Sequence, residues 1–172
     1  MKRLLTIAVF IMLSLCMTAC SVPSKGNQTV LENNLSCAFE SEVSFVLDKL
    51  NAEAELKRTD EGIWSVEFSS PNTLSGIKLE FADGDVNASY KGLSFSVPQS
   101  ALPVKAMMLN LIAAVEENSS SEQLSGEEKD GMLIVNGTLE GGDYTITADS
   151  EGKLSSFEMP NNKLKITLRD KK

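Results

Sequence analysis

The stretch PVKAMMLNLIAAVEE, residues 103–117, is where the hydrophobic pattern of this 172-residue chain changes its period. Its apolar residues recur every three or four positions, which is the spacing of one face of an α-helix. They are Val104, Met107, Met108, Leu111, Ile112 and Val115. Pro103 is tolerated in a first helical turn, and Ser100 is a nearby candidate cap. We therefore predict one main helix at 103–117.

On both sides of this helix, apolar and polar residues alternate as in half-buried antiparallel strands. The expected strands are 37–48, 50–57, 64–68, 77–81, 86–90 and 93–97 before the helix, and 132–139, 143–149, 153–159 and 163–169 after it. An acidic, serine-rich loop is expected at 118–131. Short turns such as Asp83-Gly84 favour antiparallel neighbours. We predict an α+β fold, a strongly curved antiparallel sheet (half-barrel) of about ten strands wrapped around the one main helix.

The first residues have the pattern of a secretory signal peptide. Lys2 and Arg3 precede a short apolar run at 4–17, and small residues follow it. Spanning a bilayer takes about 20 apolar residues, so a permanent transmembrane helix is the weaker interpretation. We predict a signal peptide at 1–19, cleaved just before Cys20.

The residues around this cleavage point resemble the lipobox of bacterial lipoproteins. Met17-Thr18-Ala19-Cys20 places two small residues before a cysteine, with methionine where leucine is usual. The resemblance implies that Cys20 carries a diacylglycerol, and two acyl chains suffice for stable anchoring. The alternative is an ordinary secreted protein in which Cys20 is incidental.

This interpretation divides the chain into three parts. Residues 1–19 are the signal peptide, residues 20–34 are the lipidated cysteine with a polar, flexible tether, and residues 35–172 are the folded domain. The expected location is extracytoplasmic, with a lipid anchor in the bacterial cell membrane, or in the outer membrane of a Gram-negative host.

Composition disfavours several classes of function. The formal net charge is −8, and removing Lys2 and Arg3 makes the chain more acidic still, which disfavours nucleic acid as a partner. Histidine is absent, so Ser-His-Asp and Cys-His catalysis and the commonest zinc ligand are excluded. We expect no enzyme activity, no cofactor and no metal.

Cys37 is the other cysteine outside the signal peptide. It lies on the apolar side of the first alternating run, which predicts a small buried residue rather than a nucleophile. A disulfide between Cys20 and Cys37 is the competing possibility, and it requires Cys20 to be unlipidated.

The stretch GIWSVEFSSPNTLSG, residues 62–76, together with the lipobox, the tether and the order of strands and helix, resembles the LolA/LolB-type lipoprotein-localisation fold. The resemblance extends from residue 35 to the C-terminus. It implies a concave apolar cavity suited to acyl chains.

Eight residues are candidates for lining such a cavity. They are Val104, Met107, Met108, Leu111, Ile112, Phe45, Trp64 and Phe68. Methionine adapts to irregular apolar ligands, but the same residues are also expected to fill an ordinary core. Trp64 and Tyr90 could bind a sugar or a partner; their alternating positions favour core packing instead.

Two acidic clusters are poor candidates for sites. Asp83, Asp85 and Asn87 begin like a calcium loop, but Ala88 and Ser94 occupy its glycine and glutamate positions, so a hairpin turn is favoured. A second cluster follows the helix, where a solvated loop is favoured over acid–base chemistry. It comprises Glu116, Glu117, Glu122, Glu127, Glu128 and Asp130.

Two functional hypotheses follow. The first is a binding protein, anchored in the membrane through Cys20, for a hydrophobic ligand such as a lipid or acyl chain. The second is a surface-tethered protein–protein interaction module with a filled core and no ligand, which binds another envelope protein. An enzyme is disfavoured because the sequence contains no recognisable nucleophile–base pair or metal cluster.

Overall fold

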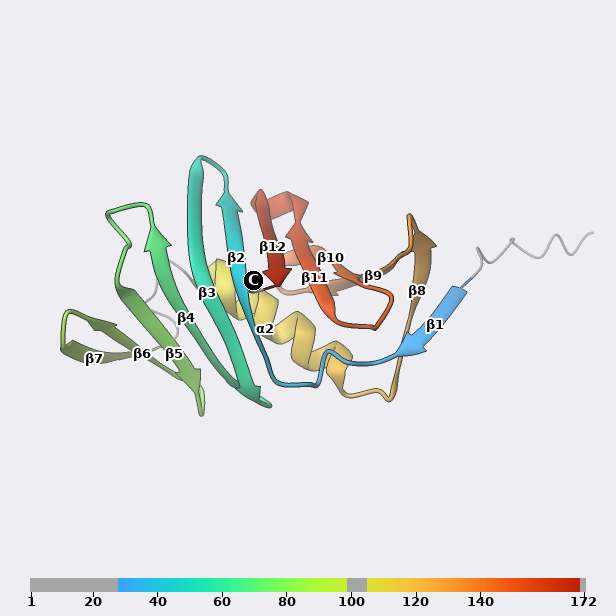
Figure 1. The fold of residues 1–172 in the computed structure, drawn as a ribbon, viewed down its shortest axis with the longest axis horizontal. Helices are drawn as coiled ribbons and strands as arrows, with labels where there is room; N and C mark the ends of the chain where they lie inside the picture. The colour runs from blue at the N-terminus through green and yellow to red at the C-terminus, as the bar shows by residue number, and fades with distance from the viewer. Residues whose placement is uncertain (1–27, 99–104, 171–172) are drawn as a thin grey trace, which may run out of the picture.

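One twelve-stranded antiparallel sheet and one long helix make up the computed structural model, which describes residues 28–98 and 105–170 (Figure 1). The first strand is β1 (Gln28–Glu32), and the long helix is α2 (Lys105–Ser119). Six more strands precede the helix: β2 (Phe39–Leu47), β3 (Leu50–Asp60), β4 (Ile63–Ser70), β5 (Ile77–Ala82), β6 (Asp85–Tyr90) and β7 (Leu93–Pro98). Five follow it: β8 (Gln123–Lys129), β9 (Met132–Leu139), β10 (Gly142–Ala148), β11 (Leu154–Met159) and β12 (Leu164–Asp170), with a 3₁₀ turn, η3 (Pro160–Asn162), before the last.

The sheet consists of two meanders joined side by side. Its strand order is β1-β8-β9-β10-β11-β12-β2-β3-β4-β5-β6-β7. The join is the antiparallel pair of β12 and β2, in which Ile166 lies opposite Phe45. β1 adds to the far side of β8, so β1 and β7 are the two edge strands.

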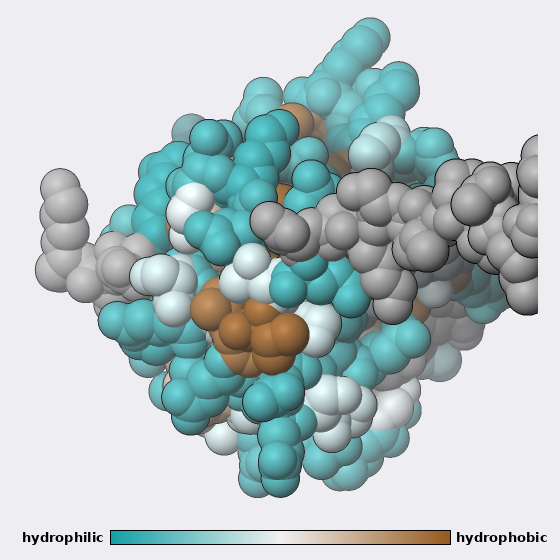
Figure 2. Space-filling view, turned by 90° about the vertical axis from the view of Figure 1, so that its right-hand side faces the viewer, coloured by the Kyte–Doolittle hydropathy of each residue, from teal (hydrophilic) through white to brown (hydrophobic). Residues whose placement is uncertain are grey.

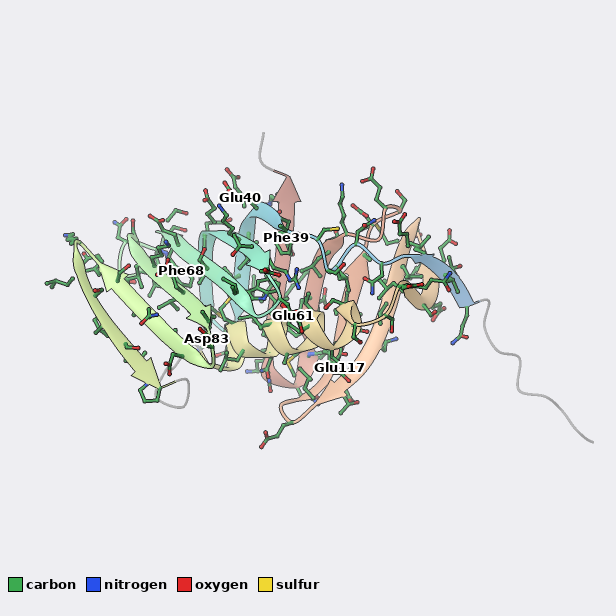
Figure 3. All side chains as sticks on the ribbon, turned by 90° about the horizontal axis from the view of Figure 1, so that it is seen from below. Phe39, Glu40, Glu61, Phe68, Asp83 and Glu117 are labelled. Carbon is green, nitrogen blue, oxygen red and sulfur yellow. The ribbon has the colours of Figure 1, made fainter. Side chains whose placement is uncertain are left out.

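The predicted half-barrel of about ten strands wrapped around the helix is wrong. The sheet has twelve strands and is not closed, and α2 lies against one face of it (Figures 1 and 3). Ten of the strands lie where the alternation predicts them. The other two, β1 and β8, come from residues predicted to be the end of the tether and the acidic loop. Both are polar; β1 pairs with β8, with Leu31 opposite Leu124, and the other side of β8 pairs with β9.

The hydrophobic core lies between α2 and the face of the sheet that the helix covers. Alternation along each strand sends every second side chain to this inner face; in β3 these are Ala52, Ala54, Leu56 and Arg58. The helix contributes the buried residues Met107, Met108, Leu111, Ala114 and Val115. Each large side chain buried in this way contributes about 1.5–3 kcal/mol.

Tight turns hold the strands at the β7 end of the sheet together. The β5–β6 turn contains Asp83 and Gly84 at φ 52° and 79°, and the β6–β7 turn contains Lys91 and Gly92 at φ 49° and 81°. Two successive left-handed residues give the turn whose twist matches that of the flanking strands. The three strands that these turns connect, β5 to β7, extend beyond the start of α2 (Figures 1 and 3).

Candidate functional site

The structure brings most of the predicted cavity residues into one cluster. Six of them are buried in the core: Phe45, Trp64, Phe68, Met107, Met108 and Leu111. Ile112 is partly buried and packs against the same core. Val104 and Cys20 lie outside the described residues. Phe45 and Phe68 are in ring contact, with centroids 5.7 Å apart.

Burial on the inner face falls sharply toward β7. Cross-strand pairing sets Leu79, Ala88 and Phe95 side by side on β5, β6 and β7. Leu79 and Ala88 are each 4% exposed, whereas Phe95 is 55% exposed. Directly opposed residues of an antiparallel pair point to the same face, so Phe95 continues the core face beyond what α2 covers.

Tyr90 and Leu93 repeat this pattern in the neighbouring row. They lie opposite each other across β6 and β7 and are 40% and 72% exposed. Val97, opposite the fully buried Val86, is only partly buried. We call Tyr90, Leu93, Phe95 and Val97 the open face. It is an uncovered apolar strip at the edge of the sheet and directly continuous with the core.

One cation lies at the end of the open face. The Nζ atom of Lys91 is 5.1 Å from the centre of the Tyr90 ring, which is within cation–π range. The Tyr90 ring also lies against the backbone at Gly76, where an added Cβ would be 3.7 Å from the ring. Tyr90 is therefore held in place although it is solvent-exposed.

A buried ion pair fixes the other end of α2 to the sheet. Glu116 accepts hydrogen bonds from Arg58 Nε (3.2 Å) and Nη2 (2.9 Å), from Trp64 Nε1 (2.7 Å) and from the backbone N–H of Gly62 (3.1 Å). Arg58 Nη1 also donates to the carbonyl of Ser36. The side chains of Arg58 and Glu116 are 3% and 19% exposed. We call Arg58, Trp64 and Glu116 the Arg58 cluster.

The Arg58 cluster keeps Glu116 ionised. Burial raises the pKa of this carboxyl, but hydrogen bonds from Arg58, Trp64 and Gly62 and the positive charge of Arg58 outweigh that effect, so the net pKa is lowered. Arg58 also lies 5.8 Å from the Trp64 ring centre, and Phe39 contacts that ring edge-on. The polar groups of the cluster bond to one another and hold α2 against the sheet.

Further polar contacts secure the C-terminal end of the helix. Asn118 donates to the hydroxyl of Tyr144 at 2.8 Å. The side-chain amide of Asn33 donates to the carbonyls of Asn118 and Ser121, both at 2.7 Å. In contrast, Met107 and Met108, near the start of the helix, pack in the apolar core.

The alternation of apolar residues in β3 already indicates that Arg58 points inward. Arg58 is in phase with Ala52, Ala54 and Leu56, so its position already marks an inward-pointing charge. An inward charge needs a partner of opposite sign, and Glu116 supplies it. Glu116 was instead assigned to the acidic cluster after the helix.

One groove on the outer face of the sheet is rich in charged side chains. This groove of about 710 Å³ crosses the outer surface of β12, β2, β3 and β4, and includes Glu42, Glu55, Glu67 and Arg169. A separate, smaller hollow of about 300 Å³ lies at the start of β2, where Cys37, Leu35 and Phe39 line it. Across the described residues, no group of three or more Cys, Asp or Glu side chains is arranged to hold a metal ion.

Three predictions for single residues have different outcomes. Trp64 is buried as predicted, with its ring in the core. Tyr90 was predicted to be a core residue, which is wrong because the edge position leaves it exposed. Cys37 was predicted to be buried and is exposed, since it precedes the start of β2; its thiol lies 3.5 Å from Asn34 Oδ1.

Two solved structures with which the fold can be compared are distant in sequence. One is an uncharacterized conserved protein from Thermus thermophilus, at 13% identity and a TM-score of 0.48 over 78% of this chain and 77% of that one. The other is a LolA superfamily protein from Nitrosomonas europaea, at 9% identity and a TM-score of 0.36 over 75% of this chain and 67% of that one. No protein-family model matches the chain, and no curated protein matches it.

A LolA superfamily protein is thus one of the structural neighbours. The lipobox residues lie outside the described part of the chain. Within that part, no helix has both the length and the apolar character needed to cross a bilayer.

Proposed function

We propose that this protein is a lipid-anchored extracytoplasmic binding protein that holds a hydrophobic ligand, such as a lipid or an acyl chain, on the inner face of its sheet. The observation that supports the proposal is the open face. Leu93 and Phe95 continue the core rows of β5 and β6 but are largely exposed, so an apolar ligand can cover them without displacing the core.

The energetics favour an extended apolar ligand. Each methylene group removed from water contributes about 0.8 kcal/mol, so even a few carbons of an acyl chain laid along β7 give measurable affinity. The open face offers no charged group between its ends, and Lys91 at one end suits a ligand with an anionic head. Specificity would then come from the length of the strip and from this single cation.

The proposed anchor is compatible with an accessible open face. The described chain begins at β1, at the opposite edge of the sheet from β7 (Figure 1). The described chain is therefore entered at the edge of the sheet farthest from β7. Metabolic labelling with an alkyne fatty acid tests the anchor: label should be incorporated into the chain and lost in Cys20→Ala, and label that persists in this variant would rule it out.

The ligand proposal can be tested with residues 21–172, which contain every described strand and helix. We expect a native mass spectrum of the purified protein to show a bound mass that matches lipid in a solvent extract. After delipidation, the protein should bind a fluorescent fatty acid such as cis-parinaric acid.

Matched variants locate the site. Leu93→Glu and Phe95→Glu should each weaken fatty-acid binding about tenfold or more, since each places a charge in the apolar strip. Ser94→Glu is the control, because Ser94 lies between them on the same exposed strand but points to the outer face. Absence of both lipid and probe binding, or equal effects of all three variants, would contradict the proposal.

A second candidate is the interaction module without a ligand. The observation that favours it is that β7 is an edge strand, so the backbone groups on its outer side have no partner strand among the described residues. A protein that carries no lipid, ignores fatty-acid probes and crosslinks to another envelope protein through β7 would favour this candidate.

A further inference from the structure

We propose that the β7 edge is a self-association surface, at which two copies of this chain pair antiparallel through β7 and join their sheets. The inference goes beyond ligand binding and does not require it. It rests on three features: the regular, uncharged β7 strand, the exposed apolar side chains of that strand, and the different charges at the two edges of the sheet.

Within the described residues 28–98 and 105–170, the β7 edge shows none of the usual protection against strand pairing. Natural edge strands are commonly blunted by charged residues, by bulges or by a covering element. The sequence of β7, LSFSVP, has no charged residue, and its pairing with β6 is regular over all six residues. Pro98 is the one residue of this strand without a backbone donor, and it lies at the very end.

The charges at the two edges indicate which edge a second copy would use. The strands and turns at 77–98 contain two lysines and three acids, so their net charge is close to zero. At the other edge, residues 28–32 and 122–131 contain five acids and one lysine. Figure 2 shows that this β1–β8 end is largely hydrophilic, around a small hydrophobic patch. Two β1 edges would repel each other, whereas two β7 edges would not.

The charges at the β7 edge are also self-complementary. Asp83 and Asp85 lie at one end of β6, and Lys91 lies at the other. A two-fold axis perpendicular to the sheet reverses the second copy, so the acidic end of each copy lies beside the basic end of the other. The same axis keeps the inner faces of both sheets on one side.

The alternation of β7 then defines a register. With Phe95 on the axis, Phe95 faces the partner's Phe95, and Leu93 faces the partner's Val97. On the outer face, Ser94 lies opposite the partner's Ser96. This register covers the most exposed apolar side chains of the described chain, Leu93 and Phe95. It would also merge two open faces into one apolar strip, a consequence that rests on the proposed function.

The test is the oligomeric state of delipidated residues 21–172, measured by sedimentation velocity over a range of concentrations. The unmodified protein should form a dimer at concentrations of about 10–100 µM, the range for modest edge interfaces. A protein that stays monomeric throughout this range would overturn the proposal, whatever its ligand-binding behaviour.

Two double variants test the register itself. Ser94→Lys with Ser96→Lys sets like charges opposite each other twice in the dimer and should weaken it about tenfold or more. Ser94→Lys with Ser96→Glu sets opposite charges at the same places and should preserve it. Both pairs lie on the outer face and leave Leu93 and Phe95 intact, so fatty-acid binding is a separate readout. If the two double variants dimerise equally, the proposed pairing is wrong.

Discussion

Replacing Glu116 with alanine removes the acceptor that the Arg58 cluster shares. The guanidinium of Arg58, 3% exposed as a side chain, would keep its charge with only the Ser36 carbonyl as a partner, and Trp64 Nε1 would lose its acceptor. Leaving one member of a buried ion pair uncompensated costs about 3–5 kcal/mol. Because Glu116 itself is 19% exposed, water can enter where its carboxylate was, so we expect a loss of about 3 kcal/mol.

The assay is urea unfolding followed by far-UV circular dichroism and by tryptophan fluorescence. The chain has a single tryptophan, Trp64, so fluorescence reports directly on the Arg58 cluster. Glu117→Ala is the matched control: it removes the same carboxylate one position along the helix, where the side chain is exposed, and should change the free energy of unfolding by less than about 0.5 kcal/mol. Arg58→Met combined with Glu116→Leu should be less damaging than Glu116→Ala, because no buried charge remains. Equal losses for Glu116→Ala and Glu117→Ala would refute this account of the cluster.

Three further predictions follow from particular residues. Because the pKa of Glu116 is lowered by folding, its stabilising contribution is present above the unfolded value near 4.5 and is lost as the pH falls through the lower folded value; Glu116→Gln should flatten this part of a plot of unfolding free energy against pH. Gly152→Ala should cost more than about 2 kcal/mol in urea unfolding, because its Cβ would collide with the carbonyl oxygen of Glu32, whereas Gly131→Ala, with a similar positive φ but open space, should cost about 1 kcal/mol. The exposed thiol of Cys37 should react with a thiol reagent in the native protein without denaturant, and protection until unfolding would contradict its position.

The periodicity of the sequence was sufficient to predict ten strands and the helix, since the period of apolar residues follows directly from backbone geometry. It could not predict β1 and β8, which are polar and are held by pairing with neighbouring strands, β1 with β8 and β8 also with β9. Nor could it predict that the sheet would stay open, because its curvature depends on how strands far apart in the sequence meet. The half-barrel was therefore inferred from element order and corrected by the structure.

For the candidate site, too, periodicity predicts which face a residue lies on but not whether that residue is covered. Alternation places Tyr90, Leu93 and Phe95 on the apolar face, as the sequence indicates, but their exposure depends on where α2 begins relative to the sheet. In the same way, Arg58 could be recognised as an inward charge on β3, whereas its partner, Glu116, is brought to it only by the packing of the helix.

The position of β12 between β11 and β2 has a consequence for how the chain acquires its structure. The two meanders form from neighbouring strands, but the seam between them closes only when residues near the C-terminus meet β2, as in the pairing of Leu164 with Leu47. During synthesis, β2 keeps one side unpaired until residues 164–170 have emerged. Non-local pairing of this kind slows folding and exposes strand edges to aggregation. The sheet is therefore complete only when β12 has paired with both β11 and β2. A chain truncated before β12 would retain two separate meanders with no strand to join them.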